Sequence, residues 1–295
     1  MIEDCRTMDS NPLQPIPPTA PSLLYHYTSH EAFKSIIENG VIRAGHYRDL
    51  KNDVSEVNFG TKELRKAVEV HVTDECDAEY KAFLLEGIDQ YFLGDLAIYI
   101  VCFTSTVDSS HHWREYTPPS QQGIAIGFDS NQVYKGFLTD IGKGLGHEVP
   151  ESIQGKPEYR PIHCRYFEQF DMAALIAKRF FGHQSYPAIF RSPHVRQGIG
   201  QQILLSTLSI SIYQTIVSIK QREFFKDMEV RLFHLGHQER RRFIDINFNP
   251  INAVREVWIG PGSEQELCRQ TVQRLIDEGR LKCEIRFSNI PCNAT

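Results

Sequence analysis

The sequence has 295 residues, of which 41% are hydrophobic and 23% are charged. These fractions are typical of a globular protein with an ordinary apolar core, in one large domain or two small ones. The net charge of −5 at pH 7 argues against nucleic-acid binding that depends mainly on electrostatic attraction. The seven cysteines include no CxxC pair, which argues against a zinc ribbon or a disulfide framework and predicts a reducing, cytoplasmic location.

Residues 1–21 are polar and rich in proline, and they lack the apolar centre of a signal peptide. We interpret them as a flexible leader before a single domain at 22–295. The longest apolar stretch runs from Ile203 to Ile219, but Ser, Thr and Gln residues interrupt it repeatedly. This stretch is too polar to span a membrane, so we expect a buried helix there and no membrane partner.

The first strong pattern is a strand that leads into a helix. Leu23–Tyr27 is rich in apolar and aromatic residues, as strands are. Thr28 and Glu31 have the spacing of a capping box, and apolar residues recur at helical spacing up to the stop signal of Gly40. His26 is therefore expected beside a helix N-terminus, a place that favours phosphate or ribose oxygens. A hydrogen-bonded core histidine is the alternative interpretation of His26.

Two helices and two buried strands are expected next. Helical spacing predicts helices over Ser55–Val70 and Asp77–Leu93. Continuous apolar runs predict central strands at Ala97–Phe103 and Gly123–Phe128. The segment 104–122 between these strands is polar, and polar segments between rigid strands often carry functional residues.

The later elements alternate between helices and strands. We expect strands at Tyr159–Phe167, Glu229–Leu235, Ala253–Ile259 and Cys283–Phe287, and helices over Phe170–Phe181, Gln201–Gln221 and Ser263–Asp277, the last with a Ser263–Glu266 capping box. Asp227, Glu229 and Arg231 alternate along the chain, so they are expected on one face of a strand. The order of elements predicts an α+β fold, with one twisted mixed or split sheet and with inserted and flanking helices.

Several short motifs resemble those of a widespread bacterial family of proteins of unknown function. The shared pattern opens at Leu24–Ser29 and continues in Ile37–Gly40, Asn52–Glu56, Cys102–Thr104, Trp113–Tyr116, Gly123–Phe128, Lys226–Arg231 and Val257–Pro261. The resemblance covers nearly the whole chain after the leader. That family is in turn similar to the ADP-ribosyltransferases, which include DNA-modifying toxins with a similar opening strand and helix.

This resemblance implies an NAD-dependent ADP-ribosyltransferase with a split sheet around NAD. Cleavage of the nicotinamide–ribose bond passes through an oxocarbenium-like state, as glycoside hydrolysis does. By the resemblance, Glu229 would stabilise that positive charge, His26 would bind the adenosine-side ribose, and Asp227 would orient or deprotonate the acceptor. An ion pair of Glu229 with Arg231 or Lys226 on a sheet face is the alternative interpretation of this glutamate.

The resemblance leaves open which aromatic residue holds nicotinamide. A first-strand histidine usually occurs with a tyrosine pair in such enzymes, whereas Thr104–Thr106 resembles the Ser-Thr-Ser element that accompanies a first-strand arginine. Tyr116, Trp113 and Tyr47 are all candidates for the stacking residue. The residues implied in binding NAD, which is the substrate and needs no metal, are Tyr27, Thr28, Ser29, Thr104, Ser105, Trp113 and Arg231.

Other sites rest on single features of the sequence. His111 and His112, with His26 or His30, offer imidazoles for a metal, but adjacent histidines point in different directions and no HExxH motif occurs. A Cys–His nucleophile has no recognisable signature around any cysteine. Arg240–Arg242 offers charge to nucleic-acid phosphates, although such a run is more often a solvated turn.

The acceptor of ADP-ribose is not named by the sequence. Protein, nucleic acid, a small molecule and water are all open, and the family context suggests a toxin or phage-defence effector. Water as acceptor would make the protein an NAD glycohydrolase. Binding without turnover would make it a nucleotide sensor that uses the same cleft.

Overall fold

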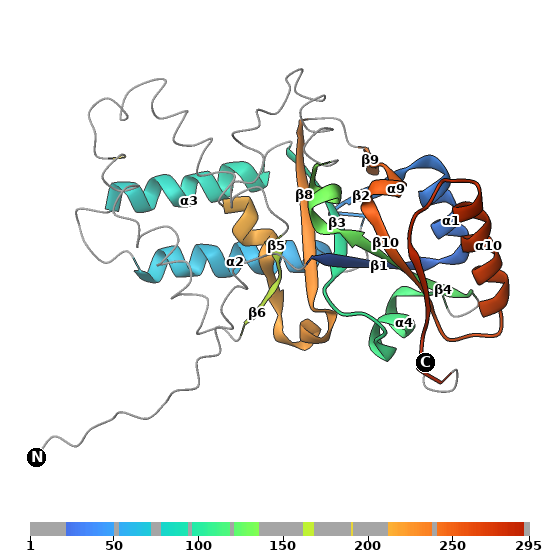
Figure 1. The fold of residues 1–295 in the computed structure, drawn as a ribbon. Coiled ribbons are helices and arrows are strands. Elements are labelled where there is room, and N and C mark those ends of the chain that lie inside the picture. Colours follow the sequence, from blue (N-terminus) through green and yellow to red (C-terminus); the bar gives the residue numbers. More distant parts are fainter. Residues whose placement is uncertain are drawn as a thin grey trace, which may run out of the picture.

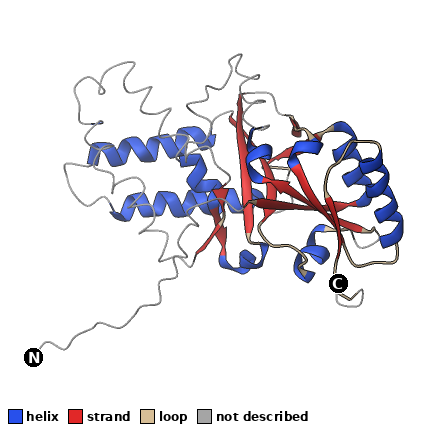
Figure 2. Cartoon of the chain, viewed as in Figure 1, coloured by secondary structure: helices blue, strands red, loops and turns tan. Residues whose placement is uncertain are grey.

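The computed structural model describes residues 22–49, 53–71, 78–93, 96–118, 121–135, 162–167, 190, 212–237 and 241–291. These residues form a mixed α/β structure in which helices lie against an open sheet of mixed strand orientation (Figures 1 and 2). The expected leader and the helix expected at Phe170–Phe181 lie outside the described residues.

The described part of the main sheet has nine strands, with every pairing antiparallel except that of its last two strands. In chain order they are β1 Leu23–Ser29, β2 Val41–His46, β3 Leu96–Thr104, β4 Gly123–Asp129, β5 Ile162–His163, β8 Glu229–His237, β9 Phe243–Asn247, β10 Val254–Ile259 and β11 Glu284–Phe287. A separate parallel pair consists of β6 Arg165–Phe167 and β7 Ile219–Gln221.

The helices that have both ends described occur between these strands. They are α1 His30–Asn39, α2 Asp53–His71, α3 Ala78–Leu93, α4 Ser110–Tyr116, the 3-10 helix η4 Arg222–Asp227, α9 Pro250–Ala253 and α10 Gln265–Asp277. A further helical segment is described at 212–218. None of the helices in the described part of the chain combines the length and apolar character needed to cross a membrane.

The sheet branches at β3. One edge of β3 pairs with β8 along its whole length, ending at Thr104↔Glu229. The other edge is shared between two strands, because β1 pairs with it at Tyr25↔Thr104 and β2 pairs with it at Gly45↔Ile100. From β1 the sheet continues through β4 and β10 to β11, and from β2 it continues to β9. The end of β3 therefore lies between the first strand and the strand that carries Glu229.

A layer of helices covers each face of the sheet. Side chains alternate across strands, so Val101 and Phe103 of β3 pack in one core with residues of α1 and α10. Ile98 and Ile100 pack in a second core with residues of α2, α3 and 212–218. Figure 1 shows α1 and α10 on one side of the sheet and α2 and α3 on the other. On the second face, α4 adds Trp113 to a smaller cluster against β1 and β4.

The expected strand-helix unit is present, but its cap differs by one residue. Ser29, and not Thr28, is the N-cap of α1, and its Oγ accepts a hydrogen bond from the Ala32 N–H at 3.2 Å. Thr28 is still in β1, because β1 pairs with β4 up to Ser29↔Gly123. Gly40 ends the helix in the left-handed conformation, with φ 62°, which confirms the predicted stop.

Two other predicted elements need correction. The helix expected over Gln201–Gln221 does not continue to its end, because Ile219–Gln221 is the strand β7. The Ser263–Glu266 capping box is not formed, since α10 begins after Glu264 with no side-chain cap. The side chain of Gln122 instead accepts a hydrogen bond from the Glu264 N–H at 3.2 Å. Gln122, which is distant in sequence, thus binds the backbone at the start of α10, a role that the local pattern had assigned to Ser263.

Candidate functional site

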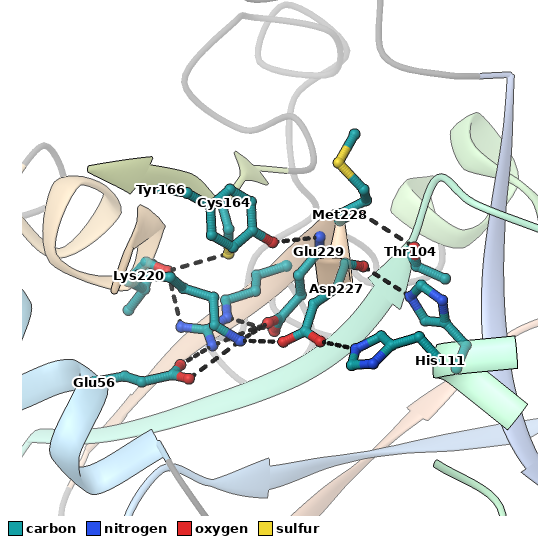
Figure 3. Close-up of polar contacts among 12 residues, drawn as sticks. Glu56, Thr104, His111, Cys164, Tyr166, Lys220, Asp227, Met228 and Glu229 are labelled. Atoms are coloured by element: carbon teal, nitrogen blue, oxygen red, sulfur yellow. Dashed lines mark hydrogen bonds and ion pairs between the residues drawn. The ribbon is translucent and has the colours of Figure 1, made fainter. Parts of the chain in front are cut away.

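Five charged side chains from different elements meet inside the protein (Figure 3). They are Glu56 of α2, Lys220 of β7, Asp227 of η4, and Glu229 and Arg231 of β8, and none of these side chains is more than 7% exposed. The Lys220 Nζ lies 3.1 Å from Glu56, 3.0 Å from Asp227 and 2.5 Å from Glu229. Arg231 binds Glu229 at 2.6 Å and also binds Glu56. Three carboxylates thus face two cations, and we call this group the charge network.

The turn between η4 and β8 brings two of the carboxylates to the same lysine. Met228, which separates Asp227 from Glu229, is left-handed with φ 42° and ψ 42°. This conformation is unfavourable for a residue other than glycine. It is held by the end of β3, because the Ser105 N–H and the Thr104 hydroxyl donate to the Met228 carbonyl at 3.2 and 3.4 Å. Thr104 and Ser105, which the sequence suggested for NAD binding, thus hold this turn in place.

The charge network sets the ionisation of its members. Burial alone would raise the pKa of Glu229, but the charges of Arg231 and Lys220 outweigh it and lower the pKa to about 2. Burial alone would lower the pKa of Lys220, yet the charges of Glu229 and Glu56 raise it overall. Both side chains are therefore charged at neutral pH, and removal of either would leave the remaining buried charges with fewer partners.

The charge network reaches the surface at His111. The His111 Nε2 lies 2.8 Å from the Asp227 Oδ1, and the His111 side chain is 23% exposed whereas that of Asp227 is 7% exposed. The neighbouring His112 is buried, and its Nε2 lies 2.9 Å from the Asp227 carbonyl oxygen. A carbonyl accepts, so this Nε2 carries the hydrogen. Burial lowers the pKa of His112, which keeps this ring neutral.

Three rings form a stack that ends at the surface. The Tyr27 and His112 rings are stacked at 5.1 Å, and the His112 and Tyr116 rings are stacked at 5.8 Å. Tyr116 is 44% exposed. Burial, and then the negative charge of Asp227, raise the pKa of the Tyr116 hydroxyl. This stack and the His111–Asp227 pair therefore meet at one place on the surface.

The structure separates the three candidates for the stacking residue by their exposure. Trp113 is 3% exposed and its Nε1 donates to the Asp108 Oδ1 at 3.0 Å. Tyr47 is buried in the core beside α2 and α3. Of the three rings, that of Tyr116 is the one with a large exposed surface. It lies on α4, a short helix that the sequence pattern did not predict.

His26 and Glu229 lie on opposite faces of the sheet. Tyr25 pairs with Thr104, and Thr104 pairs with Glu229, so these three residues share one face. His26 follows Tyr25 in the strand and points to the other face. The resemblance implies that both residues bind the same NAD molecule, and their positions on opposite faces do not agree with this expectation. The neighbours of His26 in the first strand, Tyr25 and Tyr27, lie on the Glu229 face.

The contacts of His26 are those of a core histidine. Its ring packs edge-on against that of Phe103, with the centroids 5.9 Å apart, and its Nδ1 donates to the Cys102 carbonyl at 3.1 Å. Burial lowers the pKa of His26. This carbonyl belongs to the part of β3 between its pairings with β1 and β2. His26 of β1 thus binds β3 near the point where the sheet branches.

The remaining predicted binding residues are used within the protein. The Arg231 guanidinium binds Glu229, Glu56 and the Val217 carbonyl, so the alternative of a Glu229–Arg231 ion pair is confirmed. Ser29 caps α1, and the Tyr27 hydroxyl lies 3.4 Å from the Thr106 carbonyl oxygen. Lys226, the other expected partner of Glu229, is exposed.

Three members of the site were not predicted from the sequence. Lys220 is a single charged residue directly after an apolar stretch, and Glu56 lies on the buried side of α2. Both positions are unusual for a charged residue, and this was the available signal. Rules that pair charges close together in the sequence do not detect it. His111 was considered only as a metal ligand. It binds Asp227 instead, and the described residues contain no group of three or more His, Cys, Asp and Glu side chains suited to hold a metal.

Ser288 and Asn289, which follow β11, bind Asp108 and fix the loop that leads into α4; we call these contacts the clasp. The Asp108 carboxylate accepts hydrogen bonds from the Trp113 Nε1, from the Ser288 hydroxyl at 2.5 Å and from the Asn289 N–H at 3.0 Å. Asp108 itself is left-handed, with φ 51°. Residues after β11 therefore help to place the helix that carries His111 and Tyr116.

Together, the fold and the site define a mixed α/β protein in which a buried charge network opens to the surface beside an exposed aromatic ring. No protein-family model, no curated protein and no solved structure matches this chain.

Proposed function

We propose that this protein is an ADP-ribosyltransferase that cleaves the nicotinamide–ribose bond of NAD and transfers ADP-ribose to an acceptor. The observation that carries the proposal is the convergence of an exposed aromatic ring with two carboxylates from a distant segment. Tyr116 lies close enough to Asp227 and Glu229 for both charges to raise the pKa of its hydroxyl, after the larger effect of burial. An exposed aromatic ring can stack on nicotinamide, and nearby negative charge can stabilise the positive charge that cleavage develops on the ribose.

The charge network supplies the electrostatic part of the proposed reaction. Bond cleavage develops positive charge on the ribose, and fixed charges in a dry interior act on it more strongly than charges in water. Glu56, Asp227 and Glu229 outnumber Lys220 and Arg231, so the described network has one surplus negative charge. This surplus favours positive charge on the ribose as it moves there from the nicotinamide ring in the oxocarbenium-like state.

Tyr116 supplies the binding surface for nicotinamide in this proposal. Aromatic rings stack on flat heterocycles in offset or edge-on arrangements. The ring of Tyr116 is backed by that of His112, which is in turn backed by that of Tyr27, so it is held in a fixed orientation. A fixed ring restricts the rotation of the bound nicotinamide and thereby orients the bond that breaks.

The motif resemblance supports the same reaction and extends it. ADP-ribosyltransferases have a split sheet, and the edge of β3 that β1 and β2 share is compatible with such a fold. An ADP-ribosyltransferase-like fold, a cytoplasmic location and a role as a toxin or phage-defence effector are part of the proposal. In this version of the site Asp227 and Glu229, and not His26, supply the negative charge near the reacting part of NAD.

Release of free nicotinamide from NAD tests the proposal. The purified protein, with a cell extract as the source of acceptors, is expected to release nicotinamide, measured by chromatography. Asp227→Asn should lower the rate about 100-fold, since it removes one fixed charge of a preorganised site. Glu256→Gln is a matched control, because Glu256 binds Tyr25 and Arg286 elsewhere on the same face of the sheet. Binding of NAD without nicotinamide release would identify a sensor, and neither binding nor release would overturn the proposal.

A further inference from the structure

We infer that His111 is the general base of the reaction and that the acceptor is a group that is protonated at neutral pH, such as a hydroxyl group or water. This inference rests on the proposed function and narrows it to one class of acceptor. The sequence suggested that Asp227 deprotonates the acceptor, but the geometry assigns that contact to His111.

Access favours His111 over Asp227. Both carboxylate oxygens of Asp227 are engaged, Oδ1 by His111 at 2.8 Å and Oδ2 by Lys220 at 3.0 Å. The Asp227 side chain is buried, whereas that of His111 is partly exposed at the surface. An acceptor molecule arriving from solution therefore meets the imidazole before it meets the carboxylate.

The carboxylate fixes the tautomer of His111. An ionised carboxylate only accepts, so the His111 Nε2 carries the hydrogen that it donates to Asp227. In the neutral ring the Nδ1 then holds a free electron pair. Among the residues that the structure describes, none binds this Nδ1. The buried side-chain atoms that lack a partner do not include it. The pair has the arrangement of a base held in position by a buried acid.

The proton transfer places a positive charge beside the charge network. An imidazolium at His111 lies directly beside Asp227, and the two carboxylates behind it share Lys220 and Arg231. With three carboxylates against two cations, a positive charge on His111 makes the described group neutral. The neighbouring ring of His112 stays neutral and adds no second positive charge.

The step balances as follows. The C1′–N bond of NAD breaks, and its electron pair leaves with nicotinamide, which becomes neutral. The acceptor oxygen forms a bond to C1′, and its proton moves to the His111 Nδ1 and then to solvent. A hydroxyl group or water needs such a base, because it is protonated at neutral pH. A carboxylate acceptor is already ionised and needs none.

Chemical rescue separates this role from a structural one. In His111→Gly, nicotinamide release should fall about 100-fold or more, and added imidazole should restore at least a tenth of the wild-type rate. Arg114→Gly is the matched control, since Arg114 is an exposed residue of the same short helix. It should keep the wild-type rate and show no response to imidazole. His111→Gln keeps a donor for Asp227 but offers no base, so it should stay folded and inactive.

The outcomes distinguish the inference from the proposed function. If the wild type releases no nicotinamide, the proposed function fails and the inference fails with it. If the wild type is active and His111→Gln is equally active, or if imidazole does not rescue His111→Gly, the inference alone is overturned. The products give a second readout: free ADP-ribose or a linkage stable to neutral hydroxylamine is expected, whereas a hydroxylamine-labile carboxylate ester would overturn the assignment of the acceptor.

Discussion

Lys220 and Glu229 form a direct ion pair inside the protein, with less than a tenth of either side chain exposed. Each belongs to a strand, β7 and β8, and the turn at Met228 joins the two through η4. Moving two charges out of water has a large unfavourable free energy, which is offset only if both keep their partners. The stability of this region therefore depends on the completeness of the charge network.

Replacement of Lys220 by Met should destabilise the protein by about 3–5 kcal/mol, because three buried carboxylates would be left with one cation. The free energy of unfolding is measured by urea denaturation followed by circular dichroism. Lys34→Met is the control, since Lys34 and Glu38 form an exposed pair and should contribute less than about 0.5 kcal/mol. A change below about 1 kcal/mol in Lys220→Met would contradict the prediction.

Acid should weaken the fold through Glu229. Its pKa is about 2 in the folded state and ordinarily 4.5, so the unfolded state binds the proton more readily. The contribution of Glu229 to stability is therefore fully present above pH 4.5 and is lost as the pH falls toward 2. The shift corresponds to about 3 kcal/mol. Urea denaturation near pH 6 and near pH 3 should show a smaller acid loss for Glu229→Gln than for the wild type, and equal losses would argue against this assignment.

Two left-handed glycines differ in the space around them, which allows a matched comparison. Gly279 has φ 71° and nothing within 4 Å of an added Cβ, so Gly279→Ala should cost only the conformational term of about 1–2 kcal/mol. Gly40 has φ 62°, and an added Cβ would lie 2.8 Å from the Phe248 carbonyl oxygen. Gly40→Ala should therefore cost roughly 1–3 kcal/mol more. Thermal unfolding of both variants tests the order, which equal midpoints would refute.

Loss of the exposed ring should impair the proposed reaction without affecting the fold. Tyr116→Ala should lower nicotinamide release about 10- to 100-fold, because nicotinamide is no longer oriented. Tyr116→Phe keeps the ring and should keep most of the rate. Phe225→Ala removes an exposed ring from η4 and serves as the control, with release unchanged. All three variants should unfold within about 1 kcal/mol of the wild type, since these sites are exposed. Full activity in Tyr116→Ala would remove Tyr116 from the site.

Local patterns predicted the elements whose signals lie within a few residues. The apolar periodicity of α1 and the stop at Gly40 were recovered, as were the apolar runs of β3 and β4. The N-cap was misplaced because β1 pairs with β4 one residue further than the local pattern indicates. The end of the helix before Ile219 was missed because β7 is defined by its pairing with β6, which no local pattern reports.

The candidate site was predictable only in part, because its contacts join distant segments. Asp227, Glu229 and Tyr116 came from the motif resemblance, and the structure brings them together. The pairs of Lys220 and Arg231 with Glu56 link residues far apart in the chain, so no spacing rule could indicate them. α4 has seven residues and no apolar repeat, so neither the helix nor the exposure of its tyrosine could be anticipated.

The clasp at Asp108 has a consequence for the timing of synthesis. A growing chain that has not yet released Ser288 and Asn289 from the ribosome lacks two of the three hydrogen bonds that fix this loop. It also lacks β10, which lies beside β4 in the finished sheet. The helix that carries His111 and Tyr116 is therefore fully fixed in place only after the segment that contains Ser288 and Asn289 has been synthesised.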